Sequence, residues 1–122
     1  MVNLASEIFR QRMSLQVLCP GPVDATRCQD YLIELVHDIL KMELLDCFTS
    51  DAPKFGPAAW AHITTSGVHM MVWNNHRGDP RLSFVTVDVY TCQEFPEYPV
   101  LEHAMKFFDA FEVALEPVAG QV

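Results

Sequence analysis

The chain has 122 residues, a length that suits one hydrophobic core, so we expect a single domain over residues 1–122. Half of the residues are apolar or aromatic and 20% are charged, which excludes a disordered chain. The net charge of -8 and the scattered basic residues exclude the positive surface that nucleic acid or an anionic membrane would require.

The sequence predicts neither a membrane-spanning segment nor a secretion signal. No apolar run approaches the roughly 20 residues that a spanning helix needs, and Arg10 and Arg12 interrupt the N-terminal stretch. We therefore expect a cytoplasmic protein. The cysteines form no C-x-x-C pair and have no histidine at a metal-ligand offset, so we expect no metal and four reduced thiols, at Cys19, Cys28, Cys47 and Cys92.

The first third of the chain predicts an arm, a strand and a helix. Residues 1–13 carry little pattern, and we expect a short helix or a loose arm there. Apolar residues alternate from Ser14 to Cys19, which predicts a strand that stops at Pro20-Gly21-Pro22. Asp24 then offers a side-chain cap to a helix. Its apolar positions recur at steps of three and four: Cys28, Tyr31, Leu32, Leu35, Val36, Ile39 and Leu40.

The middle of the chain predicts strands and loops. A short apolar segment, Leu44 to Phe48, is interpreted as a strand, and Thr49 to Gly56 as a loop. Three further stretches have the composition of strands: Ala59 to Thr65, Val68 to Trp73, and Leu82 to Cys92.

Residues 74–81 are rich in turn formers and predict a connection between antiparallel strands. In the strand that follows, valines at alternate positions predict a core face. A second amphipathic helix is expected from Pro99 to near Ala114, followed by a tail over residues 115–122 that frays.

This order of elements predicts an α+β fold, a two-layer α/β sandwich with a mostly antiparallel sheet and two helices on one face. The opposite sheet face, with Phe84, Tyr90 and Trp73, then has nothing from the same chain to cover it. We expect a homodimer in which a second copy covers this face.

Two segments resemble the prokaryotic S-adenosylmethionine decarboxylase family. They are Thr65-Ser66-Gly67-Val68-His69-Met70-Met71-Val72-Trp73 and Val85-Thr86-Val87-Asp88-Val89-Tyr90-Thr91-Cys92. Within the second, Asp88-Val89-Tyr90-Thr91-Cys92 fits the family pattern Asp-hydrophobic-aromatic-Thr-Cys at every position. Phe55-Gly56 is similar to the aromatic-Gly pair before the family's serine strand. The resemblance makes this chain a divergent member and implies a two-layer sandwich that dimerises across its sheet.

The resemblance also implies a chemistry. In the family, a serine attacks the preceding carbonyl, the chain splits there, and a pyruvoyl group forms that acts as an electron sink for decarboxylation. Carried over to this chain, Ser66 is the pyruvoyl precursor and the split lies between Thr65 and Ser66. Cys92 is the proton donor, and Trp73 and Phe55 are candidates for packing against the adenine of S-adenosylmethionine.

Several positions depart from the family pattern. The glutamate before the serine is Thr65, and the histidine after it is Gly67. The serine and the histidine that assist processing fall on Ala58 and Met71, which neither relay protons nor bind an oxyanion. The positions of a later glutamate and glycine hold Asn75 and Gln93.

His69 shares a strand face with Met71 and is a candidate substitute for the lost histidine. Each candidate also has a purely structural interpretation: Ser66 as a polar residue at a strand entry, Cys92 as a small buried group, and Trp73 and His69 as packing residues.

Three hypotheses follow. The first is an unprocessed, non-catalytic binding or regulatory homologue linked to polyamine metabolism, which binds S-adenosylmethionine or a related small molecule. The second is an active pyruvoyl-dependent decarboxylase that uses Ser66, Cys92 and His69. The third is an enzyme that uses the same pocket without a pyruvoyl group.

Overall fold

The computed structural model describes residues 2–116 of the chain. Its elements follow one another as β1 (Gln11–Pro20), α1 (Ala25–Glu34), a π-helical turn η1 (Leu35–Leu40), β2 (Leu44–Ala52), β3 (Gly56–Ile63), β4 (Ser66–Trp73), a short 3-10 turn η2 (His76–Gly78), β5 (Leu82–Thr91), α2 (Glu97–Phe107) and β6 (Glu112–Leu115). No helix in this part of the chain is long and apolar enough to cross a membrane.

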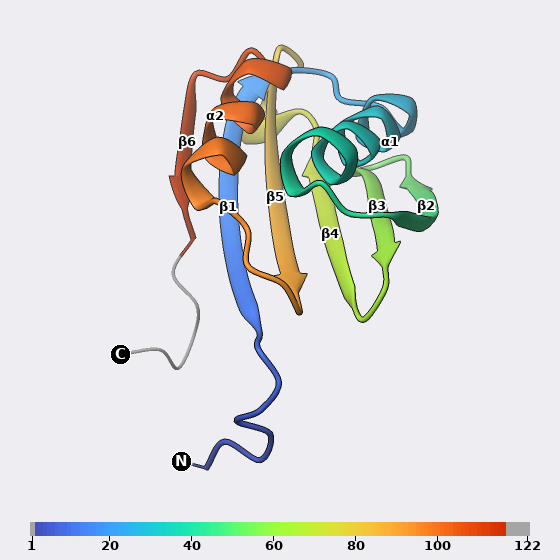
Figure 1. The fold of residues 1–122 in the computed structure, drawn as a ribbon. Helices are drawn as coiled ribbons and strands as arrows, with labels where there is room; N and C mark the ends of the chain where they lie inside the picture. The colour runs from blue at the N-terminus through green and yellow to red at the C-terminus, as the bar shows by residue number, and fades with distance from the viewer. Residues whose placement is uncertain (1, 117–122) are drawn as a thin grey trace.

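The strands form one sheet in the order β2-β3-β4-β5-β1-β6, and every neighbouring pair is antiparallel. Both helices lie on one face of this sheet (Figure 1), with α1 packed against β3 and β2 and α2 packed against β6 and β1. The predicted α+β two-layer sandwich is confirmed.

The core lies between the sheet and the helices. Alternate residues of each central strand point toward the helices, as Leu15, Val17, Val85 and Val87 do, and all four are fully buried. The helices contribute the other half of the core: Cys28, Tyr31, Leu32, Val100, Ala104 and Phe108. The valine face predicted for β5 is therefore confirmed.

The first helix begins where its cap predicts. The Asp24 side chain accepts a hydrogen bond of 2.8 Å from the backbone N–H of Arg27. The helical path continues through η1 to Leu40 and ends at Lys41, which has a left-handed φ of 55°. The apolar stripe to Leu40 is thus helical throughout, although its last part is wound as a π-helix.

The structure corrects the expectations for the first two strands. β1 begins at Gln11 rather than Ser14. Of the short helix or loose arm expected before it, the described residues contain turns and no helix. β2 runs on to Ala52, through the segment from Thr49 that was interpreted as a loop. The residues from Thr49 to Ala52 are mostly polar, yet they pair with β3. An edge strand is held by backbone hydrogen bonds to one neighbour, so its side chains can remain exposed and polar.

The second helix ends earlier than its pattern suggests. It ends at Phe107 instead of near Ala114, and Asp109 turns the chain with a left-handed φ of 49°. Phe111 then donates its N–H to the carbonyl of Leu18 at 2.8 Å, and β6 pairs with β1. The tail expected over residues 115–122 therefore begins inside a strand, and residues 117–122 lie outside the described part.

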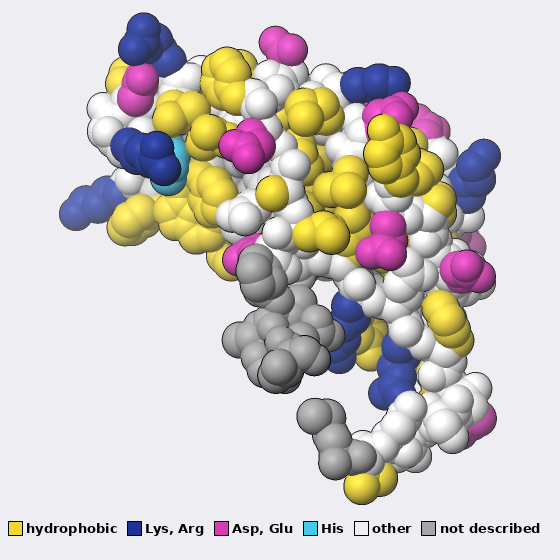
Figure 2. Space-filling view, turned by 90° about the vertical axis from the view of Figure 1, so that its left-hand side faces the viewer, with side chains coloured by type: hydrophobic (Ala, Val, Ile, Leu, Met, Phe, Trp, Pro, Cys, Tyr) yellow, Lys and Arg dark blue, Asp and Glu magenta, His cyan; other side chains and the backbone are white. Residues whose placement is uncertain are grey.

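The sheet face away from the helices, called the outer face below, carries large apolar side chains in register. One cross-strand row joins Phe48, Trp60, His69, Asp88 and Ser14. Other rows add Met71, Trp73, Phe84 and Tyr90. Figure 2 views the molecule from the β6 edge and shows hydrophobic atoms gathered at the left, the side that carries this face. Nothing in the described chain covers it.

Candidate functional site

Ser66 lies where the β3–β4 hairpin enters β4. The two turn residues are Thr64 and Thr65, and Thr65 adopts a left-handed φ of 51°. Ser66 points to the helix side of the sheet, as Val68 does, and its side chain is 9% exposed. The serine is therefore a nearly buried polar group at the end of the core.

Cys92 follows directly after β5 and contacts Ser66. Its backbone N–H donates a hydrogen bond of 3.0 Å to Ser66 Oγ, and its Sγ lies 3.5 Å from the same oxygen. Tyr90 pairs with Gly67 across β5 and β4, so the end of β5 lies beside the start of β4. The structure thus brings together the two residues that the resemblance paired.

A second hydroxyl also faces the cysteine. Thr65 Oγ1 lies 2.9 Å from Cys92 Sγ and 2.8 Å from the carbonyl oxygen of Thr64. A hydroxyl carries one proton, so Thr65 donates to only one of these acceptors at a time. When Cys92 is ionised, the sulfur is the stronger acceptor.

These hydroxyls change the acidity of the thiol. Hydrogen bonds from Ser66, and next from Thr65, lower the pKa of Cys92 below its ordinary value, because they stabilise the thiolate. The buried Cys28 shows the opposite effect, since burial raises its pKa to about 12. Cys92 is therefore the cysteine best prepared to act as an acid, a base or a nucleophile.

A hollow of about 380 Å³ opens beside this pair on the helix side of the sheet. The segment after η1 forms its other wall and contributes Lys41 and Glu43, a cation and a carboxylate that the sequence analysis did not select. The full lining is Lys41, Met42, Glu43, Ile63, Thr64, Ser66, Cys92 and Gln93. Lys41 and Glu43 lie more than 20 residues before Ser66 in the chain, and no motif connects them to it.

His69 does not join this group. It lies three residues after Ser66 in β4, and alternation along the strand places it on the outer face. Its ring stacks on Trp60, with 4.8 Å between the centroids, and its Nε2 atom is buried without a hydrogen-bond partner among the described residues. The imidazole and the Ser66 hydroxyl are therefore on opposite sides of the sheet.

Trp73 and Phe55 also lie away from Ser66, at the other end of the sheet. Seven residues separate Ser66 from Trp73 along β4, about 23 Å at about 3.3 Å per residue. The carbonyl of Phe55 accepts a hydrogen bond of 2.7 Å from Asn74, so the two aromatic residues are near one another. Within one chain, they do not line the hollow at Ser66.

Ala58 and Met71, which replace the two processing residues, pair directly across β3 and β4. Both side chains lie on the outer face, on the same side as His69.

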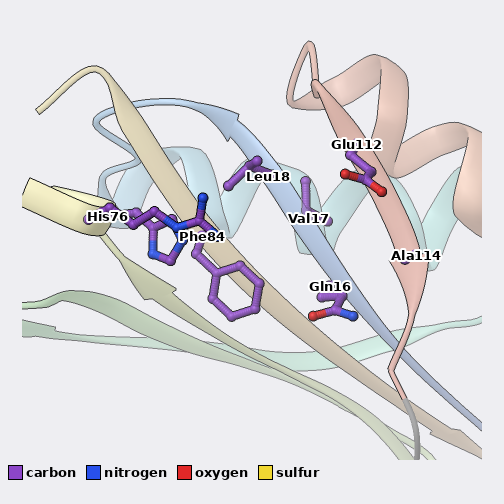
Figure 3. A pocket seen from close by; sticks show the side chains of 8 residues that line it. Gln16, Val17, Leu18, His76, Phe84, Glu112 and Ala114 are labelled. Atoms are coloured by element: carbon purple, nitrogen blue, oxygen red, sulfur yellow. The ribbon is translucent and has the colours of Figure 1, made fainter. Parts of the chain in front are cut away.

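A second hollow, of about 190 Å³, opens on this face near β6, and Gln16, Phe84 and Glu112 are among the residues around it (Figure 3).

Within residues 2–116, no group of three or more histidine, cysteine, aspartate or glutamate side chains is arranged to hold a metal ion. The expected absence of a metal stays a prediction.

Comparison with known proteins supports the fold. No protein-family model matches the chain, and no curated protein matches it in sequence. Among solved structures, the adenosylmethionine decarboxylase from Aquifex aeolicus VF5 is similar, with a TM-score of 0.53 and 15% sequence identity. The match covers 93% of this chain and 98% of that one. At this identity the likeness shows a shared fold and leaves the activity open.

Proposed function

We propose that this chain is a non-catalytic relative of the adenosylmethionine decarboxylases. It keeps their fold, leaves Ser66 unprocessed, and binds a small molecule as a regulatory homologue linked to polyamine metabolism. The observation that carries the proposal is the set of partners around Ser66. Among the described residues, its hydroxyl hydrogen-bonds to the backbone N–H and the thiol of Cys92 and to no imidazole or carboxylate.

These surroundings do not fit the formation of a pyruvoyl group. Attack of Ser66 Oγ on the Thr65 carbonyl needs a base for the hydroxyl proton and donors for the oxyanion that forms. The oxygen instead accepts a hydrogen bond from the Cys92 N–H, and the candidate imidazole, that of His69, faces the other side of the sheet. Ala58 and Met71 supply neither function.

The competing proposal is an active pyruvoyl-dependent decarboxylase cleaved between Thr65 and Ser66. It is favoured by one contact, the 3.5 Å between Ser66 Oγ and Cys92 Sγ, because the lowered pKa of this thiol makes it a usable base. An enzyme that uses the hollow without a pyruvoyl group has Cys92 as its nucleophile or acid.

Denaturing mass spectrometry distinguishes these proposals. We expect one species of 13.8 kDa after prolonged incubation, for the natural chain and for Ser66→Ala alike. Hydroxylamine, which cleaves esters, detects a stalled ester intermediate and should leave the chain intact. Two fragments split before Ser66, absent in Ser66→Ala, would establish the pyruvoyl enzyme and overturn our proposal.

Ligand binding is tested at the hollow. A volume of about 380 Å³ is within the range of small-molecule sites. We expect S-adenosylmethionine to raise the melting temperature and to slow alkylation of Cys92. Gln93→Trp should fill the mouth of the hollow and abolish both effects, whereas Glu94→Trp, an exposed neighbour that does not line it, should preserve them. Equal binding by both variants would place the ligand elsewhere.

A further inference from the structure

The hollow of about 190 Å³ on the outer face, called the β6 hollow below, is separate from the one at Ser66. It lies over β5, β1 and β6, on the side of the sheet that the helices leave free, and η2 forms one wall. Two rows of outward side chains form its floor: Glu112, Leu18 and Phe84 in one, and Ala114 and Gln16 in the other. Figure 3 shows Leu18 between the Phe84 ring and the Glu112 carboxylate. The β6 hollow shares no residue with the hollow at Ser66.

The wall that η2 forms is held in a defined position. The His76 ring stacks on the Phe84 ring, with 5.4 Å between the centroids. Asn75 and Arg77, the residues on either side of His76, both have a left-handed φ, of 55° and 56°. Such a conformation is uncommon for residues other than glycine and persists where neighbouring contacts hold it. The turn therefore presents Arg77 at the hollow at a cost in backbone strain.

The β6 hollow has one cationic and one anionic side chain, and neither is neutralised within residues 2–116. Arg77 and Glu112 both line it, yet no ion pair joins them to each other or to another described residue. Arg81, in contrast, is bound by Asp79 at 3.1 Å. Arg77 comes from the turn before β5 and Glu112 from β6, and these two strands lie about 10 Å apart because β1 separates them. The opposite charges thus approach the hollow from opposite sides.

The ligand that suits this arrangement has one charge at each end and an apolar middle. A guanidinium binds a carboxylate through paired hydrogen bonds, and the Glu112 carboxylate suits an ammonium group. The floor between the two charges is apolar, at Leu18 and Phe84. The volume is below the about 300–1,000 Å³ of drug-sized pockets, so only a short chain fits. An α-amino acid carries both charges at one end and leaves one wall unused.

We propose that the β6 hollow binds a short ω-amino carboxylate. The carboxylate lies on Arg77, the ammonium group on Glu112, and the methylene chain over Leu18 and against Phe84. The proposal rests on the outer face alone and stands whether or not Ser66 is processed. Exposed ion pairs contribute little, so the dissociation constant is on the order of a millimolar.

NMR titration of isotopically labelled protein tests the proposal, with δ-aminovalerate as the probe. The amide signals of Leu18, Arg77 and Ala114 should shift in a saturable way, and those of Cys92 and Gln93 should not. Three analogues isolate the charges: valerate lacks the ammonium group, pentylamine lacks the carboxylate, and norvaline is the isomer with both charges at one end. Each should bind about 5-fold more weakly, since each loses one ion pair.

Substitutions assign the two ends of the ligand. Arg77→Gln should remove the advantage of δ-aminovalerate over pentylamine, and Glu112→Gln its advantage over valerate. Arg81→Gln and Glu94→Gln are matched controls. Each makes the same change of net charge at an exposed residue that does not line the hollow, so both should preserve binding. The NMR spectra show that each variant is folded.

Three results would overturn the proposal. The first is the lack of a saturable shift at tens of millimolar probe, and the second is equal binding of norvaline. The third is a set of shifts centred on Cys92, which would place the ligand at the hollow beside Ser66. An equal loss of affinity in Arg77→Gln and Arg81→Gln would also refute it, because it would reduce the effect to net charge.

Discussion

The hydroxyl of Tyr31 is buried and has no partner among residues 2–116, and removing it should stabilise the protein. The ring is fully buried between α1 and α2, with its centroid 4.7 Å from that of Phe108 and 5.3 Å from that of His103. The hydroxyl has no hydrogen-bond partner in the described part of the chain. Burial raises the pKa of Tyr31 well above its ordinary value, so the group stays neutral.

The size of the effect follows from this environment. A buried hydroxyl without a partner costs about 1–3 kcal/mol of desolvation, and Tyr31→Phe recovers this cost while losing the contacts of one oxygen atom. We expect the free energy of unfolding to rise by about 1 kcal/mol and the melting temperature by about 3–5 °C for a chain of this length.

Urea unfolding and calorimetry measure this gain, with Tyr98→Phe as the control. Tyr98 is on α2 and is 72% exposed, so water solvates its hydroxyl and the substitution should change stability by less than about 0.5 kcal/mol. A loss of stability of about 1 kcal/mol or more in Tyr31→Phe would refute the reasoning, because it would mean that the hydroxyl is satisfied in the folded protein.

Three further predictions concern side-chain hydrogen bonds and thiols. Asn74 makes three side-chain hydrogen bonds of 2.6–3.0 Å, two of them to the loop before α1, so Asn74→Ala should lower the free energy of unfolding by about 2–4 kcal/mol; a loss below about 0.5 kcal/mol in urea unfolding would contradict this. Alkylation of Cys92 should have a pH midpoint below that of an ordinary thiol, and Ser66→Ala should move the midpoint upward, since it removes the main cause of the lowered pKa; equal midpoints by iodoacetamide kinetics would exclude that cause. Burial, the largest cause, raises the pKa of Cys28 from 9.0 to about 12, so the unfolded chain releases this proton first and stability should fall as the pH rises above about 9. Cys28→Ala should flatten this decline in urea unfolding at a series of alkaline pH values, and an unchanged slope would disprove the assignment.

Local patterns predicted the layers of the fold well. Asp24 caps the first helix as expected, because a side-chain oxygen at that position satisfies a free backbone N–H. The alternating valines of β5 determine which face is buried. The end of α2 was missed because Phe111 continues the helical spacing of apolar residues. In the structure, Asp109 turns the chain out of the helix, and the backbone N–H of Phe111 then bonds to the carbonyl of Leu18 in β1. That partner is distant in the sequence and invisible to a periodic pattern.

The candidate site was predictable only in part. The pairing of Ser66 with Cys92 was implied by the family resemblance, and the structure places the two side chains in contact. Lys41 and Glu43 were not found, since a π-helical turn carries them to the hollow and the sequence pattern does not distinguish that turn from an α-helix. His69 lies three residues after Ser66 in β4. Because successive side chains of a strand point to opposite faces, an odd number of steps places the two side chains on opposite sides of the sheet.

The strands at the two margins of the sheet bear on how the protein behaves when concentrated. An edge strand has unpaired N–H and C=O groups that accept another strand, and long uncharged edges lead to fibrillar aggregation. Here β2 carries Asp46 and Asp51, and β6 has only four residues, one of them Glu112. Joining two such edges would bring carboxylates together on a chain of net charge -8. The margins therefore oppose growth of an intermolecular sheet.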